Sequence, residues 1–296
     1  MKVLNFGSLN IDYVYRVDRF ALPGETISSV KMERFCGGKG LNQSIALARA
    51  GIPVAHGGCI GGDGAFLVEE LQENGVDTEN IRILSSPSGH AVIQVDAGGE
   101  NTILLYPGAN YAISRQQIDK TLEGYGDGDI LLLQNEVNEI PYIMERAAAK
   151  GMKIFFNPSP LTLAVEEYPL HLVSCFLVNA LEGASLSGEE GTEKILAGIR
   201  NKFPKAQTVL TLGENGACYD AGGKQYTQSA FPVKVVDTTA AGDTFTGYFI
   251  AELLRGNSPH AILRWACGAS ALAVSRRGAA PSIPMREEVN TFLQNR

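Results

Sequence analysis

The stretch that decides the fold is Asp237-Thr238-Thr239-Ala240-Ala241-Gly242-Asp243-Thr244-Phe245-Thr246-Gly247. We expect a buried strand at Val233–Val236 just before it. After it, apolar residues recur at helical spacing over Gly242–Leu254, until Gly256 supplies a stop. The turn between strand and helix should leave the first backbone N–H groups of the helix without a partner.

These N–H groups and the positive end of the helix dipole predict an anion site. Ala240, Ala241 and Gly242 are small enough to let a phosphate approach the backbone. Asp243 would lie beside that phosphate, which is costly unless its carboxylate accepts a proton from a hydroxyl attacking the phosphorus. The alternative is an ordinary acid in the first turn of a core helix, where the dipole favours it. The pattern suits phosphoryl transfer and leaves both roles open for the carboxylate.

Length and composition exclude several classes of protein. With 296 residues, 45% hydrophobic and 19% charged, the chain is long enough for one large α/β core plus an excursion. The net charge of −7 and the lack of a dense Lys/Arg run argue against broad nucleic-acid binding. Met1-Lys2 leads straight into strand-like residues, and no apolar segment reaches about 18 residues. We expect a cytoplasmic protein without a membrane partner.

The cysteines and histidines show no metal-binding or disulfide pattern. The five cysteines are scattered and have no C-x-x-C spacing, as expected of reduced thiols. The four histidines lie far apart, which disfavours a zinc site.

Short apolar runs alternate with amphipathic segments along the chain. We expect core strands at Val3–Gly7, Val54–Ile60, Asp129–Gln134, Lys153–Asn157, Cys175–Asn179 and Thr208–Leu212. We expect helices at Leu41–Ala50, Ala65–Asn74, Ser114–Leu122, Glu139–Lys150 and Glu189–Lys202. This order predicts an α/β fold with a mostly parallel sheet, helices on both faces, and ligands at the carboxyl ends of the strands.

Two regions break the alternation. Tyr13–Phe20 with Thr26–Phe35, and His90–Asp96 with Glu100–Tyr106, read as strands without intervening helices. They indicate either a small sheet projecting from the core or an edge extension of the main sheet. We expect one domain over residues 1–296, with lid segments at about 13–35 and 90–106.

A second glycine-rich segment runs from Phe35 to Gln43 and contains Gly37-Gly38-Lys39-Gly40 before a predicted helix. Its spacing is not that of a Walker A loop. The dinucleotide fingerprint also fails here at its third glycine, as it does at Gly61–Gly64. The glycines allow close approach of the backbone to a ligand, although many such turns serve only packing.

Taken together, these motifs resemble the ribokinase (phosphofructokinase-B) family of sugar kinases over nearly the whole chain. The double-glycine lysine loop and the D-T-T-x-A-G-D turn are together highly specific. The motifs that carry the resemblance are Gly7-Ser8-Leu9-Asn10-Ile11-Asp12, Pro23-Gly24-Glu25-Thr26, Gly37–Gln43, Gly108-Ala109-Asn110, Asn157-Pro158-Ser159-Pro160 and Asp237–Gly247.

The resemblance implies transfer of the ATP γ-phosphate to a primary hydroxyl of a sugar, foremost D-ribose to give D-ribose 5-phosphate. It makes Asp243 the base and the amides of residues 240–242 the anion hole. The sugar would lie between the main sheet and the lid. By position its contacts would be Asn10, Asp12, Gly37, Gly38, Lys39, Asn42, Glu136 and Asp243.

The nucleotide side is likewise implied by resemblance. Its residues would be Asn179, Glu182, Thr211, Gly213, Gly216, Gly242 and Cys267. Glu182 would act on Mg²⁺ through bound water, since Mg²⁺ prefers oxygen ligands and keeps several waters. Taken alone, the N-x-x-E of Asn179 and Glu182 is typical of a helix-capping pair.

The resemblance also implies an activating potassium ion, bound mainly by backbone carbonyl groups. The matching positions are Asp237, Thr239, Ala273, Arg276, Gly278 and Ser282. A homodimer is implied as well, because the lid strands would otherwise expose unpaired edges.

Other functions stay open. The nearest is a kinase for another furanose, a fructose-type ketose, deoxyribose or a nucleoside, whose base could pack on Tyr13, Tyr15 or Phe35. A sugar-binding sensor that has lost transfer is a different class, disfavoured by the intact Gly242-Asp243. A nicotinamide-dependent dehydrogenase is weakened by the missing fingerprint.

Overall fold

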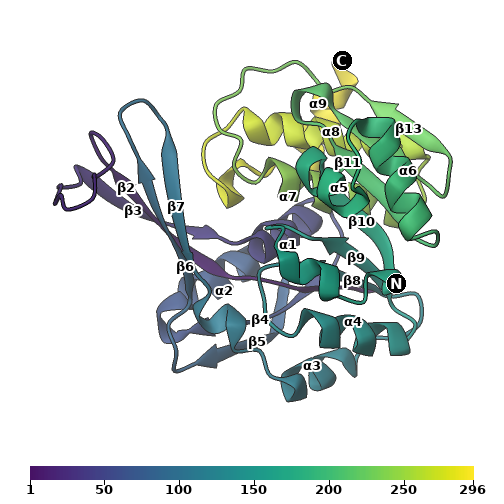
Figure 1. The fold of residues 1–296 in the computed structure, drawn as a ribbon, viewed down its shortest axis with the longest axis horizontal. Coiled ribbons are helices and arrows are strands. Elements are labelled where there is room, and N and C mark those ends of the chain that lie inside the picture. The colour runs from purple at the N-terminus through teal and green to yellow at the C-terminus, as the bar shows by residue number, and fades with distance from the viewer.

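The computed structural model describes all 296 residues and contains two separate sheets (Figure 1). The main sheet has nine strands, in the order β13 (Gln225–Gln228), β12 (Ala217–Asp220), β11 (Gln207–Thr211), β10 (Val173–Asn179), β9 (Lys153–Asn157), β8 (Ile130–Gln134), β1 (Val3–Phe6), β4 (Val54–Gly61) and β5 (Asp77–Leu84). Its pairings are parallel except that β12 runs antiparallel to both of its neighbours. The predicted mostly parallel sheet is confirmed.

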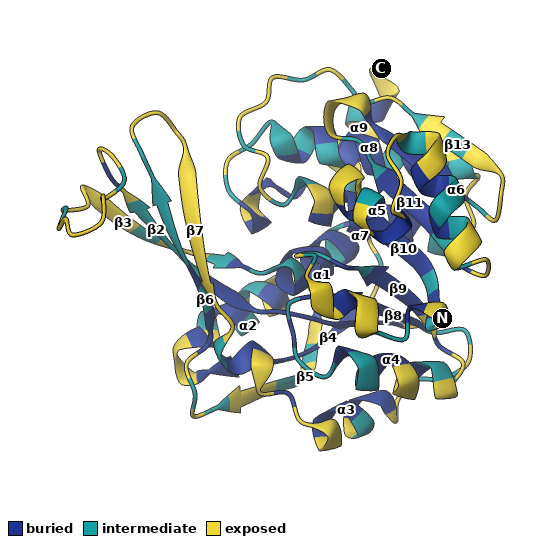
Figure 2. Cartoon of the chain, in the orientation of Figure 1, coloured by how far each residue is buried: buried dark blue, intermediate teal, exposed yellow.

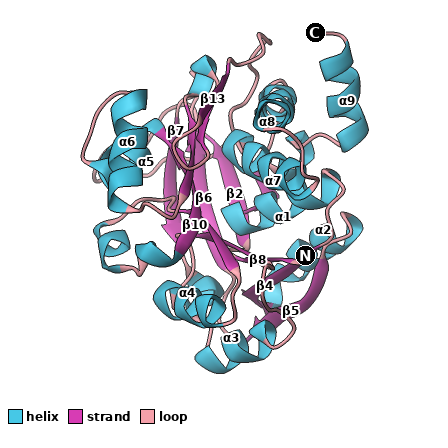
Figure 3. Ribbon diagram, turned by 90° about the vertical axis from the view of Figure 1, so that its right-hand side faces the viewer, coloured by secondary structure: helices cyan, strands magenta, loops and turns pink.

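Helices cover both faces of this sheet (Figure 3). One face carries α1 (Lys39–Arg49), α2 (Ala65–Glu73), α7 (Ala241–Leu254), α8 (Pro259–Val274) and α9 (Arg286–Gln294). The other carries α3 (Arg115–Leu122), α4 (Ile140–Ala149), α5 (Ala180–Ser187) and α6 (Thr192–Lys202). Short 3₁₀ turns lie at Gly62–Gly64, Gly108–Tyr111, Leu163–Glu167, Leu170–Leu172, Gly213–Asn215 and Ala280–Ser282. Each face encloses its own apolar core, of 35 and 30 buried residues respectively.

The predicted strand at Val233–Val236 is wrong. The segment is an irregular loop, in which the Val235 and Val236 side chains are 61% and 46% exposed. Its backbone finds a partner other than a strand, because the N–H groups of Val236 and Asp237 both donate to the Val274 carbonyl at the end of α8. A loop that closes on a helix end needs no place in the sheet.

The predicted helix at Glu189–Lys202 begins too early. Gly188 and Gly191 have φ values of 76° and 85°, which end one helix and precede the next. The structure therefore has a separate helix α5, which the sequence reading missed, and α6 starts at Thr192.

The small sheet is a separate body and not an extension of the main one. Its order is β3 (Lys31–Gly37), β2 (Asn10–Arg16), β6 (Gly89–Val95) and β7 (Asn101–Tyr106). It projects from the N-terminal half of the molecule (Figure 1), and its outer strands are largely exposed (Figure 2). The predicted strands Tyr13–Phe20 and Thr26–Phe35 are displaced, since β2 starts at Asn10 and residues 17–30 contain no strand.

No helix is long and apolar enough to cross a membrane.

Helices α1 and α7 cross closely at Gly247, and this contact places the N-termini of both helices at one end of the sheet. A Cβ atom on Gly247 would lie 2.4 Å from the Ala46 Cβ and 2.8 Å from backbone atoms of α1. The glycine is therefore required by packing, against its low helix propensity.

We expect Gly247→Ala to lower the free energy of unfolding by about 1–3 kcal/mol, because the added methyl group overpacks the crossing. Denaturant titration measures the loss. Gly124→Ala is the matched control, since a Cβ there meets nothing within 4 Å. A Gly247→Ala protein as stable as the control would show that the helices do not need this close contact.

Candidate active site

A cavity of about 200 Å³ opens where the carboxyl ends of β9, β10 and β11 meet the N-termini of α1, α5 and α7. Several residues predicted from the sequence line it together: Lys39, Asn179, Glu182, Thr211, Ala240, Ala241, Gly242 and Asp243. The other lining residues are Asn157, Ser159, Leu177, Val178, Val209, Thr238, Phe245 and Thr246. Its position at the carboxyl ends of parallel strands is where α/β sheets bind ligands.

The N-terminus of α7 supplies unpaired backbone donors to this cavity. Ala240 occupies the N-cap position with φ 58° but provides no side-chain cap. The first hydrogen bond of the helix runs from the Thr244 N–H to the Ala240 carbonyl, at 2.8 Å. The N–H groups of Ala240 and Gly242 have no hydrogen-bond partner. That of Ala241 is partly engaged, at 3.3 Å from the Thr238 carbonyl. A Cβ on Gly242 would meet nothing within 4 Å, so a ligand has room to approach.

Helix α1, which begins beside α7, has partners for the N–H groups of its first three residues. The Lys39 N–H donates to Glu136 Oε2 at 2.9 Å, and the N–H groups of Gly40 and Leu41 donate to Ser8. Glu136 also accepts a short hydrogen bond from the Ser8 hydroxyl. Because the first turn of α1 is already capped, an anion entering the cavity finds its open donors at α7.

Asp243 is held by two side-chain amides. It is 7% exposed, and Asn42 Nδ2 donates to its Oδ2 at 3.1 Å while Gln43 Nε2 donates to its Oδ1 at 2.9 Å. Both donors lie in the second turn of α1, so the α1–α7 crossing fixes the carboxylate. Each carboxylate oxygen keeps a further acceptor position.

Lys39 lies among three carboxylates. Burial by itself lowers the pKa of this ammonium group, but the negative charges of Asp243, Glu136 and Glu182 outweigh burial and hold the pKa above its usual value. Burial raises the pKa of Glu136, although Lys39 and the hydrogen bonds from Ser8 and the Lys39 amide oppose the rise. The cavity thus places one cation among several acidic groups.

Asp12 lies where β2 meets β3 at the base of the small sheet. Burial first, and then the charge of Glu136, raise its pKa to about 7. A Cβ on Gly37 would lie 2.2 Å from Asp12 Oδ2, so any larger residue at position 37 would displace the Asp12 carboxylate. No protein group donates a hydrogen bond to the Asp12 carboxylate, which leaves it available to a ligand.

The other residues predicted for the sugar are close by but outside the cavity lining. Asn10 is 6% exposed, and its Oδ1 accepts from Asn110 Nδ2 at 2.7 Å. Gly38 has φ 95° and caps α1. Asn42 contacts the cavity residue Asp243, to which it donates, and Glu136 contacts the cavity residue Lys39, whose N–H it accepts.

Four of the residues predicted for the nucleotide line the cavity and three do not: the lining ones are Asn179, Glu182, Thr211 and Gly242, and the others are Gly213, Gly216 and Cys267. Asn179 and Glu182 form the helix-capping pair that the sequence allows, with reciprocal bonds of 2.9 and 3.0 Å at the start of α5, and both also line the cavity. Gly213 and Gly216 form a turn after β11, where a Cβ on Gly216 would lie 2.0 Å from the Gln228 carbonyl. Cys267 lies on the buried side of α8, is 6% exposed and does not line the cavity.

The residues predicted for potassium come from two loops that touch and from the end of α8. Asp237 accepts hydrogen bonds from the Thr239 N–H and hydroxyl and from the Gly278 N–H, and these bonds lower its pKa despite partial burial. Ala273 lies near the end of α8, and the Ser282 hydroxyl donates to the Ala279 carbonyl.

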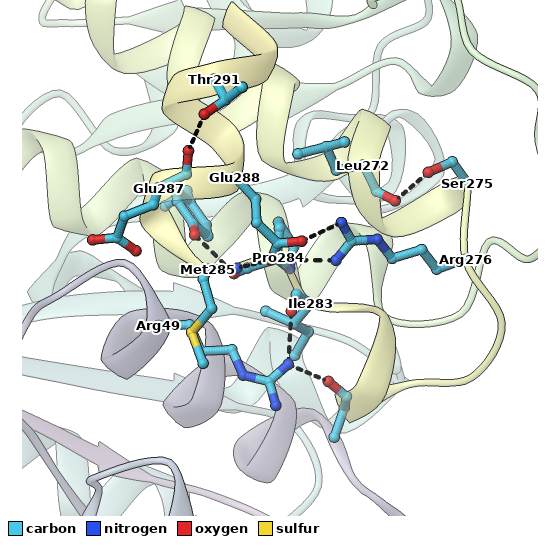
Figure 4. A network of polar contacts seen from close by, with 12 residues as sticks. Arg49, Leu272, Ser275, Arg276, Ile283, Pro284, Met285, Glu287, Glu288 and Thr291 are labelled. Carbon is cyan, nitrogen blue, oxygen red and sulfur yellow. Dashed lines mark hydrogen bonds and ion pairs between the residues drawn. The ribbon is translucent and has the colours of Figure 1, made fainter.

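Figure 4 shows the hydrogen bonds and ion pairs that the neighbouring side chains make. The Arg276 guanidinium pairs with Glu288 at 2.6 Å, so any part Arg276 has in binding a cation falls to its carbonyl group. Arg49 donates to the carbonyl groups of Ala280 and Ile283 at 2.8 and 2.6 Å, which ties this loop to the end of α1.

Sequence reasoning missed several polar residues around the cavity, chiefly Gln43 and Asn157. Gln43 directly follows Asn42, and its complete burial next to Asp243 depends on how α1 lies on the sheet. Asn157 ends β9, so its place at a strand's carboxyl end was the available signal.

Comparison with known proteins agrees with this geometry. Residues 1–286 match the pfkB family carbohydrate kinase. The chain is 34% identical to a ribokinase of Haemophilus influenzae, covering 98% of this chain and 97% of that one, and 36% identical to a ribokinase of Staphylococcus aureus, covering 98% of each. The solved structure of Arabidopsis thaliana ribokinase with ribose and ATP is similar with a TM-score of 0.88 and 29% identity, covering 99% of this chain and 98% of that one.

A cavity with an acid at an uncapped helix N-terminus, the double-glycine loop and a match over nearly the whole chain lead to one conclusion: the protein belongs to the pfkB family of carbohydrate kinases.

Proposed function

We propose that the protein transfers the γ-phosphate of ATP to the primary hydroxyl of D-ribose and releases D-ribose 5-phosphate. The observation that carries the proposal is the pairing of Asp243, held by two amides, with the open backbone donors of α7 in one cavity. The choice of ribose rests on the ribokinase relatives.

In this proposal Asp243 orients the sugar hydroxyl and takes its proton. A sugar hydroxyl is far less acidic than a carboxylic acid, so deprotonation before attack would be uphill. In a loose transition state the hydroxyl becomes acidic late, and the carboxylate collects the proton as the new bond forms. The amides of Ala240, Ala241 and Gly242 receive the charge that develops on the phosphoryl group.

The sugar would lie over the base of the small sheet. Carboxylates accept hydrogen bonds from vicinal hydroxyls, a role for which Asp12 has free acceptors and Glu136 lies next to Lys39. Asn10, Gly37, Gly38, Lys39 and Asn42 complete the proposed contacts.

ATP would lie along the ends of β10 and β11, against Asn179, Thr211, Gly213 and Gly216, with Gly242 at its phosphates. Glu182 fits a magnesium ion held through water, because it is an oxygen donor 7% exposed on the cavity wall. Magnesium would neutralise phosphate charge next to the acidic groups of the cavity. The two loops at Asp237 and Gly278 are the proposed potassium site, with Thr239, Ala273, Arg276 and Ser282.

We also propose a homodimer through the small sheet, within a single domain over residues 1–296. Edge strand β7 exposes Ile103, Leu104 and Leu105 by 57%, 70% and 50% of their surfaces, and an unpaired apolar edge favours association. Sedimentation should show a dimer that Leu104→Lys weakens, and a monomeric wild type would contradict it.

Five cysteines without a disulfide suit the cytoplasm.

The second candidate is a kinase for another sugar or a nucleoside, which needs no change in the transfer chemistry. The aromatic Tyr13 at the base of the small sheet is the feature that favours it.

We expect Asp243→Asn to lower kcat by roughly 10²- to 10⁴-fold with little change in ATP binding, the usual scale for a positioned base. ADP release measures kcat, and calorimetry measures nucleotide affinity. Turnover near that of the wild type would remove Asp243 from this role.

The raised pKa of Asp12 predicts a pH dependence of sugar use. If the ionised carboxylate accepts the sugar hydroxyls, kcat/KM for ribose should fall about tenfold between pH 8 and pH 6, because the group is protonated below its pKa of about 7. The Asp12→Asn variant should have a lower kcat/KM that does not vary over this range. A step that persists in the variant would assign it to another group.

Potassium should activate the enzyme above its rate in sodium or choline at equal ionic strength. The measurement compares initial rates in the three chloride salts. Equal rates in all three would rule out the proposed monovalent site.

A further inference from the structure

Three buried amide side chains continue inward from Asp243. Asn5 on β1, Gln134 at the end of β8 and Gln43 on α1 are all 0% exposed. Asn5 is paired with Leu132 across the two strands, so Gln134 is its diagonal neighbour on the same sheet face, under α1. None of the three belongs to the substrate contacts proposed above.

The hydrogen bonds of these amides run in one direction. Asn5 Nδ2 donates to the Gly40 carbonyl at 2.8 Å, and a carbonyl oxygen only accepts, so the Asn5 amide is fixed with Oδ1 toward Gln134. Gln134 Nε2 then donates to Asn5 Oδ1 at 3.0 Å and to Gln43 Oε1 at 2.6 Å. Gln43 is left with Nε2 toward Asp243, as observed at 2.9 Å.

A side branch from Asn5 agrees with this direction. Asn5 Nδ2 also donates to Ser44 Oγ at 2.9 Å. The Gly7 carbonyl, 3.2 Å from His56 Nε2, can only accept, so a neutral His56 carries its proton on Nε2 and its Nδ1 accepts from the Ser44 hydroxyl at 2.8 Å. Burial lowers the pKa of His56 to about 4, which keeps the ring neutral.

From this arrangement we infer that Gln43 and Gln134 are positioning residues for Asp243, and that the chain anchored on the Gly40 carbonyl keeps an amide donor turned toward the carboxylate. A reversed Gln43 would place its oxygen against a buried anion. A reversed Gln134 would bring its oxygen against those of Asn5 and Gln43. The observed direction leaves Gln134 Oε1 buried without a partner. This lowers stability, but it keeps the donors of the three amides pointing toward Asp243.

Only the catalytic consequence of this inference rests on the proposed role of Asp243 as base. The hydrogen-bond direction itself is testable without a substrate, by exchanging the donor and the acceptor. The variants are Gln43→Glu, Asp243→Asn and the double variant.

At pH 8 we expect Gln43→Glu to lower Tm by at least about 5 °C, because two carboxylates then face each other in a buried place. Adding Asp243→Asn should recover at least half of this loss, since the amide introduced at position 243 can donate to the carboxylate introduced at position 43. If Gln43→Glu alone does not fold, a double variant that does fold counts as the same rescue. A double variant no more stable than the single one overturns the inference.

Turnover provides the second readout. In Gln43→Glu the two carboxylates share a proton to higher pH, so the acid limb of the kcat–pH profile should move up by at least one pH unit. The charged groups that face Asp243, Lys39 and Glu136, are unchanged in this variant. Gln134→Met removes the donor to Gln43 without adding charge. It should lower kcat about tenfold and leave KM for ATP unchanged, and an unchanged kcat overturns the role of Gln134.

Gln117→Glu is the matched control. Gln117 is also buried, at 3% exposure, and bonds to the Gly58 carbonyl at 2.8 Å, but has no path to Asp243. We expect it to lose stability and to keep the acid limb of the wild type. If Gln117→Glu shifts the acid limb of the kcat–pH profile as much as Gln43→Glu does, the shift does not depend on contact with Asp243, and the inference is wrong. If the wild type phosphorylates no sugar, the proposed function fails, while the Tm rescue still decides the direction of the chain.

Discussion

The site depends on the two hydrogen bonds that Asn42 and Gln43 donate to the Asp243 carboxylate. They join α1 to α7 at the point where both helices begin, and the tight crossing at Gly247 makes the reach possible. A carboxylate that is 7% exposed needs such donors, because an unpaired buried charge would be strongly destabilising. The same bonds fix where a proton acceptor faces the cavity, so the packing of the fold and the proposed chemistry share one constraint.

The second constraint is that two neighbouring helix N-termini differ in whether their first backbone N–H groups have hydrogen-bond partners. Glu136 and Ser8 satisfy the first donors of α1, whereas α7 begins with backbone N–H groups that lack partners. An anion is therefore directed to α7. Lys39, surrounded by carboxylates, keeps its charge and offsets part of the repulsion that phosphate groups would meet in an acidic cavity.

Much of the fold was predictable from hydrophobic periodicity and glycine positions. The central strands and the helix after Ala240 lie close to where they were expected, because buried parallel strands and long helices leave strong local patterns. Val233–Val236 has the valine-rich composition of a strand but forms a loop, because its backbone is bonded to the end of α8. Helix α5 has only eight residues and directly follows β10, so hydrophobic periodicity predicts it poorly.

The site divides in the same way. The Asp243 turn and the Lys39 loop carry sequence motifs, so their residues can be predicted from the sequence. Gln43 and Gln134 come from distant segments that meet only when α1 is laid on the sheet, and their roles follow from hydrogen-bond direction, which no spacing encodes.

The most direct test of the central claim is product formation by the wild-type protein with Mg-ATP and potassium, across ribose, deoxyribose, fructose, other hexoses and several nucleosides. ADP release ranks the acceptors, and ³¹P NMR identifies the phosphorylated position. We expect selective turnover of D-ribose with phosphate on its primary hydroxyl. Absence of turnover with every acceptor would contradict it and favour a sugar-binding protein without transfer.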